Sequence, residues 1–397
     1  IGPLDRATLS VRIEPGVTQG DLHAWLTKEA PDLAFNNTGS GLRTSILGCA
    51  LERGIGYAGP LERDLFALEV MLPDGEIVRP DPAWFHPARA TPAGPQHDAL
   101  FFQSNYGIVL AARLRLRVRQ QKEQAVIVNG PLPGLLATLR EAYRDGVLTL
   151  PTHISEPGRT GRLAQGRLAE VRGRPVSAEE VATVFPERDE HVALTAPHGR
   201  AQVVDAAWRE LRAGFGPGVR GWRIGAGGAR RLERIGRMLG LRNQADRLAA
   251  FAPVLALTWG EPSDIGLLAL PPTADRGNPD TAAEGAIYGN AVSAVDAGAA
   301  AAIAGLIREV WPHAACTSIV LDARCLITVF TLHFQDDETA AAKAAEQTIA
   351  RRLLAAGHPP YRLGINLPGP AGGGLHARLK QALDPRGIVA PGRYEKA

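Results

Sequence analysis

The stretch from Ser45 to Gly59 reads SILGCALERGIGYAG and is rich in residues that lack a bulky side chain. It holds four glycines in a segment otherwise apolar enough to be core. Glycine gains nothing from side-chain packing and costs roughly 0.5–1 kcal/mol in a regular element. Repeated glycine therefore indicates unusual backbone angles, or a backbone that a ligand must approach closely. Tight turns and helix–strand packing without a ligand are the alternative.

The cysteines and histidines show no spacing typical of a metal site. Cys49, Cys316 and Cys325 are odd in number and far apart, so we expect neither a disulfide framework nor a zinc site. The histidines are scattered, and we assign no metal. The sequence GAGGARR, which begins at Gly225, lacks the phosphate-loop pattern and is predicted to be a loop of a second domain. This cysteine usage fits a reducing, cytoplasmic location.

The composition favours a small-molecule partner. The chain has 397 residues, enough for two domains or one large one, with 44 basic residues against 41 acidic ones. Because the charges balance and the basic clusters are short, we expect no nucleic acid and no membrane among its partners. No apolar run is long enough to span a bilayer.

Up to about residue 120 the pattern predicts strands with short helices. Residues 7–17 alternate apolar and polar side chains before a turn, which is typical of a strand. Residues 18–30 have apolar side chains at helical spacing. Residues 65–80 are predicted to form a hairpin, and residues 114–118 alternate strictly.

After the polar stretch at residues 119–124 the pattern changes to mixed strands and helices. Residues 152–173 are predicted to form strands with a basic loop. Residues 315–334 predict two strands joined by a turn, with a strong helix on either side in the sequence. This order suits an antiparallel sheet covered by helices, so we expect a second domain of the α+β class.

Four segments, in this order and at these separations, resemble the vanillyl-alcohol-oxidase and p-cresol-methylhydroxylase family of flavoproteins. They are VRIEPGVTQGDLHAWL (11–26), SILGCALERGIGYAG (45–59), GPQHDALFFQSNYGIV (94–109) and LDPRGIVAPGRY (383–394). The resemblance implies an α+β fold. It consists of the second half of a p-cresol-methylhydroxylase-type FAD-binding domain and an α+β cap domain with a helix-covered antiparallel sheet.

The resemblance also implies the domain boundaries. Residues 1–120 correspond to the second half of the FAD-binding domain, 121–355 to the cap or substrate-binding domain, and 356–397 to a C-terminal segment that returns to the FAD-binding domain. Relatives carry a further segment at the front, which makes the first half of the flavin domain. Three explanations stay open: the segment is disordered, it belongs to another polypeptide, or it is lost.

In this family the glycine-rich run passes its backbone along FAD, where small residues permit close approach. The residues that the resemblance assigns to the cofactor are Ser45, Gly48, Cys49, Gly54, Gly56, Ile108, Val109 and Arg393. Ala286 falls at the position where relatives carry a flavin-linking histidine. The resemblance therefore implies FAD bound without a covalent link.

The dipeptide Tyr361-Arg362 falls where phenol oxidases of this family carry a Tyr-Arg pair. A phenolate is a better hydride source than a phenol, so a fixed cation and a hydroxyl donor favour the reactive form. An ordinary surface arginine beside an aromatic residue is the alternative. Ser40 aligns with an aspartate that some relatives place near the flavin N5. Arg324 lies near substrate-facing histidines of relatives, with a plain turn arginine as the alternative.

From this resemblance we expect an FAD-dependent oxidoreductase that oxidises a para-substituted phenol or aromatic alcohol by hydride transfer to flavin N5. Two alternatives remain open. One is a flavin-fold protein without redox activity that serves as a binding partner or catalyses a non-redox step in secondary metabolism. The other is a flavin oxidase of hydroxy acids or sugars. The expected partner is a small aromatic substrate, and a homodimer is the candidate assembly.

Overall fold

The chain folds into two compact units. The computed structural model describes residues 1–79, 86–88, 94–119, 122–186, 190–269, 284–367, 369 and 374–394. Unit 1 contains Ile1–Asn36, Leu42–Val118 and Arg362–Ala397, and unit 2 contains Asn37–Gly41 and Arg119–Tyr361. The division into two units does not show what each unit binds. The assignment of residues 1–120 and 356–397 to an FAD-binding domain and of residues 121–355 to a cap domain therefore stays a prediction.

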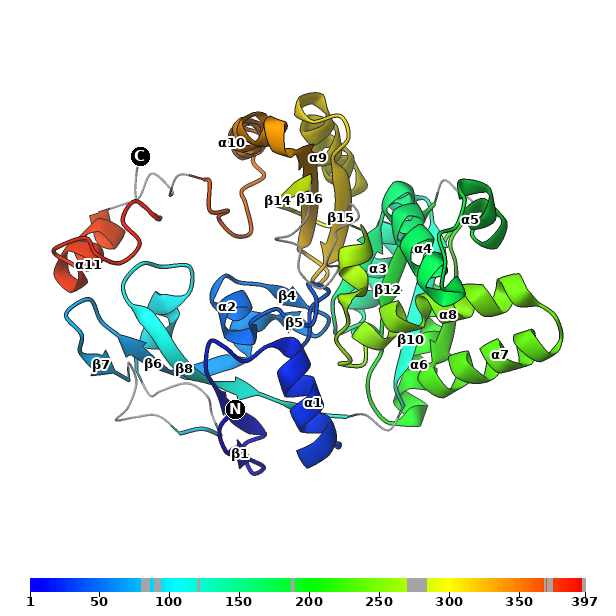
Figure 1. Ribbon diagram of the computed structural model, residues 1–397, viewed down its shortest axis with the longest axis horizontal. Coiled ribbons are helices and arrows are strands. Elements are labelled where there is room, and N and C mark those ends of the chain that lie inside the picture. Colours follow the sequence, from blue (N-terminus) through cyan, green and yellow to red (C-terminus); the bar gives the residue numbers. More distant parts are fainter. Residues whose placement is uncertain are drawn as a thin grey trace. The chain divides into compact units, whose positions relative to one another are not determined.

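Unit 1 is built on a five-stranded antiparallel sheet (Figure 1). The strands lie in the order β1 (Leu4–Asp5), β2 (Ser10–Ile13), β8 (Ile108–Arg115), β6 (Leu65–Met71) and β7 (Ile77–Val78). The hairpin predicted over residues 65–80 is confirmed, because β6 pairs with β7.

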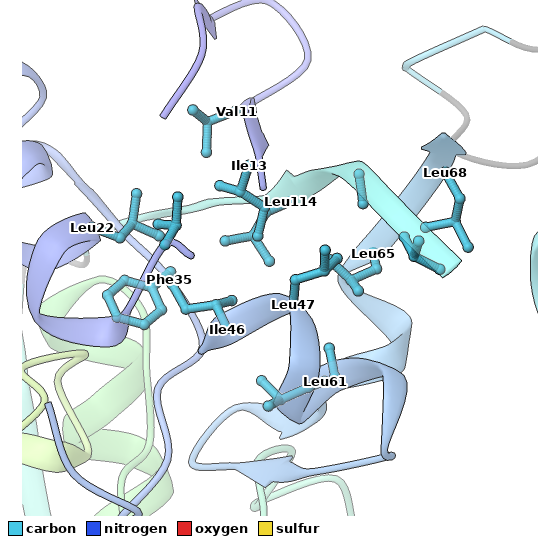
Figure 2. Close-up of a cluster of buried hydrophobic side chains, with 14 of the residues drawn as sticks. Val11, Ile13, Leu22, Phe35, Ile46, Leu47, Leu61, Leu65, Leu68 and Leu114 are labelled. Carbon is cyan, nitrogen blue, oxygen red and sulfur yellow. The ribbon is translucent and has the colours of Figure 1, made fainter. Parts of the chain in front are cut away.

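A hydrophobic core packs against this sheet (Figure 2). Side chains from β2, β6 and β8 meet those of two short helices, α1 (Gln19–Glu29) and α2 (Ile46–Leu51). Thr18 starts α1 with a capping box, since its hydroxyl accepts from Asp21 N and the Asp21 carboxylate accepts from Thr18 N. The cap fixes the helix so that Leu22 and Leu26 are buried.

Unit 1 also contains several smaller elements. They are the pairs β3 (Leu33–Ala34) with β9 (Arg117–Val118) and β4 (Ile55–Gly56) with β5 (Gly59–Pro60), the 3-10 turns η1 (Leu61–Arg63) and η2 (His97–Phe101), and α11 (Gly374–Leu383).

Unit 2 is built on a seven-stranded antiparallel sheet (Figure 1). Its order is β13 (Arg220–Gly225), β10 (Gln124–Gly130), β12 (His191–Thr195), β11 (Thr152–Ser155), β15 (Ala315–Val320), β16 (Leu326–Gln335) and β14 (Glu284–Ser293). The expected α+β class and the antiparallel sheet are confirmed.

Unit 2 also contains ten helical elements in its described residues. They are α3 (Leu132–Arg144), α4 (Pro157–Arg172), α5 (Ala178–Val184), α6 (Ala201–Ala213), α7 (Ala226–Met238), α8 (Arg242–Leu257), η3 (Asp264–Ala269), α9 (Ala297–Val310), η5 (Asp336–Glu338) and α10 (Thr339–Ala355). Those that share a hydrophobic core with strands of this sheet are α3, α6, α9 and α10. In the described residues no helix is both long and apolar enough to cross a membrane.

Two local predictions were wrong in unit 2. Residues 152–173 form only one short strand, β11, before the long helix α4. Pro157 stands in the first turn of α4, where proline favours a helix start, whereas the glycines and arginines that follow it suggested a loop. The GAGGARR sequence forms no loop. Gly225 precedes α7 and the following residues form its first turns.

Candidate functional site

The glycine-rich stretch begins at a helix cap. The hydroxyl of Ser45 accepts a hydrogen bond from Gly48 N at 3.1 Å and donates one to Pro15 O at 2.6 Å. Ser45 therefore starts α2 and ties it to the turn before α1. A Cβ added at Gly48 would come within 3.3 Å of the Ser45 hydroxyl, so the cap itself favours glycine there.

Gly54 is explained by packing within the chain. A Cβ added at Gly54 would lie 2.3 Å from Cys49 Sγ and 3.1 Å from a methyl carbon of Leu61. The Cys49 side chain thus fills the space that Gly54 leaves. Burial raises the pKa of the Cys49 thiol, which keeps it in the protonated, unreactive form.

Gly59 is different, because open space lies beside it. Its φ is +133°, it is buried, and an added Cβ would meet no heavy atom within 4 Å. Asn36 holds this turn: its Nδ2 donates to Gly59 O at 2.9 Å and its Oδ1 accepts from Ala58 N at 2.8 Å. The same Nδ2 donates to Asp64, whose pKa is raised by burial. Sequence reasoning missed Asn36, for which two adjacent asparagines after a strand were the only signal.

Ile108 and Val109 play different structural roles at the start of β8. Ile108 is 49% exposed, whereas Val109 is buried in the core of unit 1. Only Ile108 presents a large apolar surface that a ligand could cover.

The carboxylate of Glu52, at the end of α2, joins three segments of unit 1. It accepts from Gln103 Nε2 at 2.8 Å, from the Tyr394 hydroxyl at 3.1 Å and from Arg393 Nη2 at 3.2 Å. The Arg393 guanidinium also stacks on the Tyr394 ring, 4.5 Å from its centroid. Arg393, expected at the cofactor, is therefore engaged in holding the C-terminal segment to α2.

Gln103 acts as a clamp on the residue that follows Arg362. Its Oε1 accepts from Leu363 N at 3.0 Å and its Nε2 donates to Leu363 O at 3.1 Å. Its own backbone has a φ of +47°, a left-handed conformation that non-glycine residues adopt only under constraint. Sequence reasoning missed both Glu52 and Gln103 as organising residues.

Arg362 is brought to the glycine-rich stretch. Its Nη1 donates to the carbonyl oxygen of Glu52 at 3.3 Å, and its charge favours the thiolate form of Cys49, although burial outweighs that effect. The cation and the end of α2 are thus parts of one cluster, although they are separated by 310 positions in the sequence.

The other expected catalytic residues lie in unit 2. Tyr361 N donates to Asn290 Oδ1 on β14 at 2.6 Å. Ser40 is exposed, and its hydroxyl shares a 2.5 Å hydrogen bond with Thr38. Arg324 occupies the β15–β16 turn, where its side chain is 89% exposed and pairs with Asp322 at 3.3 Å. This position fits the alternative that Arg324 is an ordinary turn arginine.

Two further expectations concern metals and the flavin link. Among the described residues, no group of three His, Cys, Asp or Glu side chains could hold a metal ion. Ala286 lies on β14 opposite His333 of β16. Alanine has no nucleophile, so no covalent flavin bond can form at position 286. The non-covalent mode of binding stays a prediction.

The fold of this chain is similar to that of known proteins over nearly its whole length. The structure superposes on a 4-ethylphenol oxidase from Gulosibacter chungangensis, solved with isoeugenol, with a TM-score of 0.79, 18% identity and coverage of 99% of this chain and 77% of that one. A p-cresol methylhydroxylase with bound substrate gives a TM-score of 0.77 at 18% identity, covering 99% of this chain and 77% of that one. The chain has the vanillyl-alcohol-oxidase and p-cresol-methylhydroxylase fold. The resemblance inferred from the four segments is confirmed.

Sequence comparison adds the cofactor and a curated relative of this flavoprotein fold. Residues 1–81 match the family model described as an FAD binding domain. FAD is thus confirmed as the cofactor. Over 433 aligned residues the chain is 28% identical to 1'-carboxy-chondrochloren decarboxylase of Chondromyces crocatus, covering 97% of this chain and 78% of that protein.

FAD fits the described part of unit 1. The open space beside the buried Gly59 would let a flat ring system approach the main chain, which a side chain at that position would prevent. Exposed Ile108 offers an apolar surface of the kind that an aromatic ring covers. Gly54 gives no such space, because Cys49 already occupies it.

Proposed function

We propose that the protein oxidises a para-substituted phenol or aromatic alcohol, which it binds as the phenolate. FAD, when bound, supplies the hydride acceptor at its N5. The benzylic hydrogen leaves with the C–H electron pair as hydride, and a lone pair of the phenolate oxygen forms the carbonyl of the neutral quinone methide. The protein's task is to hold the ionised substrate and to exclude water.

The observation that carries this proposal is the anchoring of Arg362. Its guanidinium donates to the Glu52 carbonyl, and the Gln103 amide holds the next peptide unit through two hydrogen bonds. A cation held in this way needs little reorganisation when a phenolate arrives, so its charge favours the ionised substrate. Tyr361, its neighbour in the chain, supplies the hydroxyl donor in this proposal.

The remaining site residues have smaller roles in the proposal. The main chain of Ser45, Gly48, Cys49 and Gly56 would run beside the cofactor, with Ile108 against its ring and Val109 behind. Gly54 would contribute by making room for the Cys49 side chain. Ser40 would line the reactive carbon without acting as a base, since a hydroxyl holds its proton at neutral pH. Arg393 is assigned to anchoring because it pairs with Glu52, and Arg324 to the β15–β16 turn.

The ionisation of a bound phenol tests the role of Arg362. Phenolate absorbs at longer wavelength than phenol, so titration of an inert para-substituted phenol on the FAD-loaded protein gives the pKa of the bound ligand. We expect the pKa to lie below that of the free phenol, and Arg362→Ala to raise it by about 1–3 pH units because the fixed cation is removed. Arg324→Ala is the matched control and should change nothing. Equal pKa values for the wild type and Arg362→Ala would refute the assignment.

A second candidate is decarboxylation, and the relative from Chondromyces crocatus favours it. This relative is a decarboxylase and aligns with nearly the whole chain. In a decarboxylation without net oxidation, CO₂ leaves and a proton takes its place on the carbon. Incubation with a carboxylated phenolic substrate under anaerobic conditions separates the two reactions. CO₂ release with unchanged flavin absorbance would support the decarboxylase, whereas loss of flavin absorbance supports the oxidase.

A further inference from the structure

Helix α7 turns its large apolar side chains away from the helix that it packs against. It contacts α8 mainly through small residues: Ala229 and Gly236 are buried, and a Cβ added at Gly236 would lie 3.4 Å from that of Ala245. An amphipathic helix of a globular domain normally does the reverse and buries its largest apolar residues. The exposed apolar residues of α7 and of the turn after it, which we call the apolar ridge, are Leu232, Ile235, Met238, Leu239 and Leu241.

The apolar ridge runs to the tip of the α7–α8 hairpin. Met238 is 80% exposed and Leu239 is 68% exposed, among the highest values for large apolar residues in the described part of the chain. The residues of the ridge at positions 232, 235 and 239 follow a spacing of three and four, which aligns them along one side of the helix. A continuous stripe of this kind marks a binding surface rather than scattered surface exposure.

Arginines border the apolar ridge. Arg230, Arg231 and Arg234 lie on α7 and Arg242 starts α8, and within the described residues none of these four makes an ion pair. The acidic residues nearby are already engaged, since Glu233 pairs with Arg237 and Asp246 pairs with both Arg237 and Arg172. The surface therefore combines apolar side chains with arginines that have no ion-pair partner in the described part of the chain.

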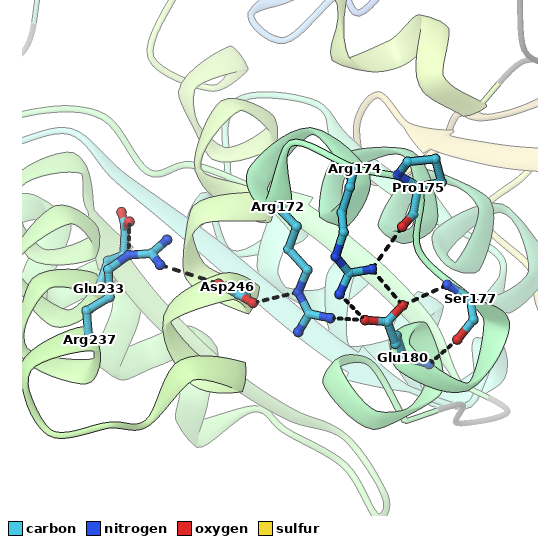
Figure 3. A network of polar contacts seen from close by, with 8 residues as sticks. All are labelled: Arg172, Arg174, Pro175, Ser177, Glu180, Glu233, Arg237 and Asp246. Carbon is cyan, nitrogen blue, oxygen red and sulfur yellow. Dashed lines mark hydrogen bonds and ion pairs between the residues drawn. The ribbon is translucent and has the colours of Figure 1, made fainter.

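A polar network holds the hairpin in place (Figure 3). Asp246 on α8 accepts from Arg172 Nε at 3.0 Å, and Arg172 Nη1 reaches Glu180 at 2.8 Å. Because this network ties α8 to α4 and α5, the ridge stands on a fixed base. Its exposure follows from the packing of α7 on α8 and not from a loose helix.

We propose that the apolar ridge docks the protein onto an anionic lipid surface. The positive border complements acidic headgroups, and leucine, isoleucine and methionine side chains can enter the boundary of the acyl chains without a matching cavity. A second copy of the chain is a poorer occupant, because it would bring the same arginines against these. One ridge of five side chains is also small beside the roughly 800 Å² that each partner of a stable protein pair buries.

Sedimentation with vesicles tests this proposal on the FAD-loaded protein. We expect it to bind vesicles that mix phosphatidylcholine and phosphatidylglycerol, to stay in solution with phosphatidylcholine alone, and to dissociate in high salt. Met238→Ser with Leu239→Ser should lower the partition coefficient about tenfold through lost apolar burial. Arg231→Gln with Arg234→Gln should lower it about tenfold through lost attraction.

The matched control removes two exposed leucines elsewhere, Leu354→Ser with Leu375→Ser, and should leave binding unchanged. Thermal melting checks that each variant folds. Three results would overturn the proposal: no binding to the acidic vesicles, binding that the ridge variants do not weaken, or equal binding to neutral vesicles. A wild type that forms a larger species, dissociated by Met238→Ser with Leu239→Ser, would instead assign the ridge to a second copy.

Discussion

At the scale of single residues, Gln103 is the residue that sets the position of Arg362. Its side-chain amide makes two hydrogen bonds with the backbone of Leu363, as a neighbouring strand would. The Gln103 Nε2 group also donates to Glu52. The acceptance by Glu52 fixes which side of the amide is the donor, so that Oε1 faces Leu363 N. Loss of this clamp would free the backbone beside the cation without removing the charge.

We predict that Gln103→Ala weakens the binding of a para-substituted phenol about tenfold and raises the pKa of the bound ligand toward its free value. The two hydrogen bonds to Leu363, about 1 kcal/mol each, are lost together with the one to Glu52, and the backbone beside the guanidinium is then no longer held in one position. Calorimetric titration and the absorbance titration measure the two effects. Gln96→Ala, an exposed glutamine of the same segment, is the control. A lower melting temperature with unchanged phenol ionisation would reduce Gln103 to a purely structural role.

At the scale of elements, the buried Lys380 joins α11 to the segment that precedes β8. Lys380 Nζ lies 2.7 Å from Asp384 and also donates to the carbonyl oxygens of Asn105 and Val389, both at 2.8 Å. Burial by itself would raise the pKa of Asp384, but Lys380 and the N–H groups of Ile388 and Val389 lower it to about 2. The ionised carboxylate therefore holds the C-terminal segment on unit 1.

This low pKa predicts how stability changes with acidity. A carboxyl group with a lowered folded-state pKa stabilises the fold above its unfolded pKa of about 4, and that contribution is lost as the pH falls from about 4 to about 2. Asp384→Asn should thus melt at a lower temperature than the wild type near neutral pH, with a difference that shrinks as the pH approaches 2. Calorimetry of both proteins across this range measures it. A difference that does not vary with pH would contradict the role of the charge.

At the scale of the whole molecule, the sequence predicted the regular parts better than the contacts between distant segments. Alternation and turn residues were enough for the β6–β7 hairpin and for the strand pair β15–β16. The partner of Arg393 lies 341 positions away at Glu52, and no local pattern encodes that pairing. Likewise, the presence of glycine at position 54 does not indicate whether a ligand or Cys49 fills the space beside it.

The net charge and composition of the whole chain did not indicate the apolar ridge. A net charge of +3 gave no reason to expect an anionic surface as a partner. The arginines of α7 act together only because the helix turns them outward beside Leu232, Ile235 and Met238. The glycines that suggested a loop at residues 225–228 likewise belong to the helix start.

The anaerobic reduction of the bound flavin by a para-alkylphenol tests the central claim most directly. The FAD-loaded wild type should lose its flavin absorbance when mixed with the phenol. Arg362→Ala should lose it two to three orders of magnitude more slowly, about 3–4 kcal/mol of lost transition-state stabilisation, while Arg324→Ala keeps the wild-type rate. A flavin that stays oxidised in the wild type, or one that Arg362→Ala reduces at the same rate, would contradict the proposal that this fold acts on phenols through Arg362.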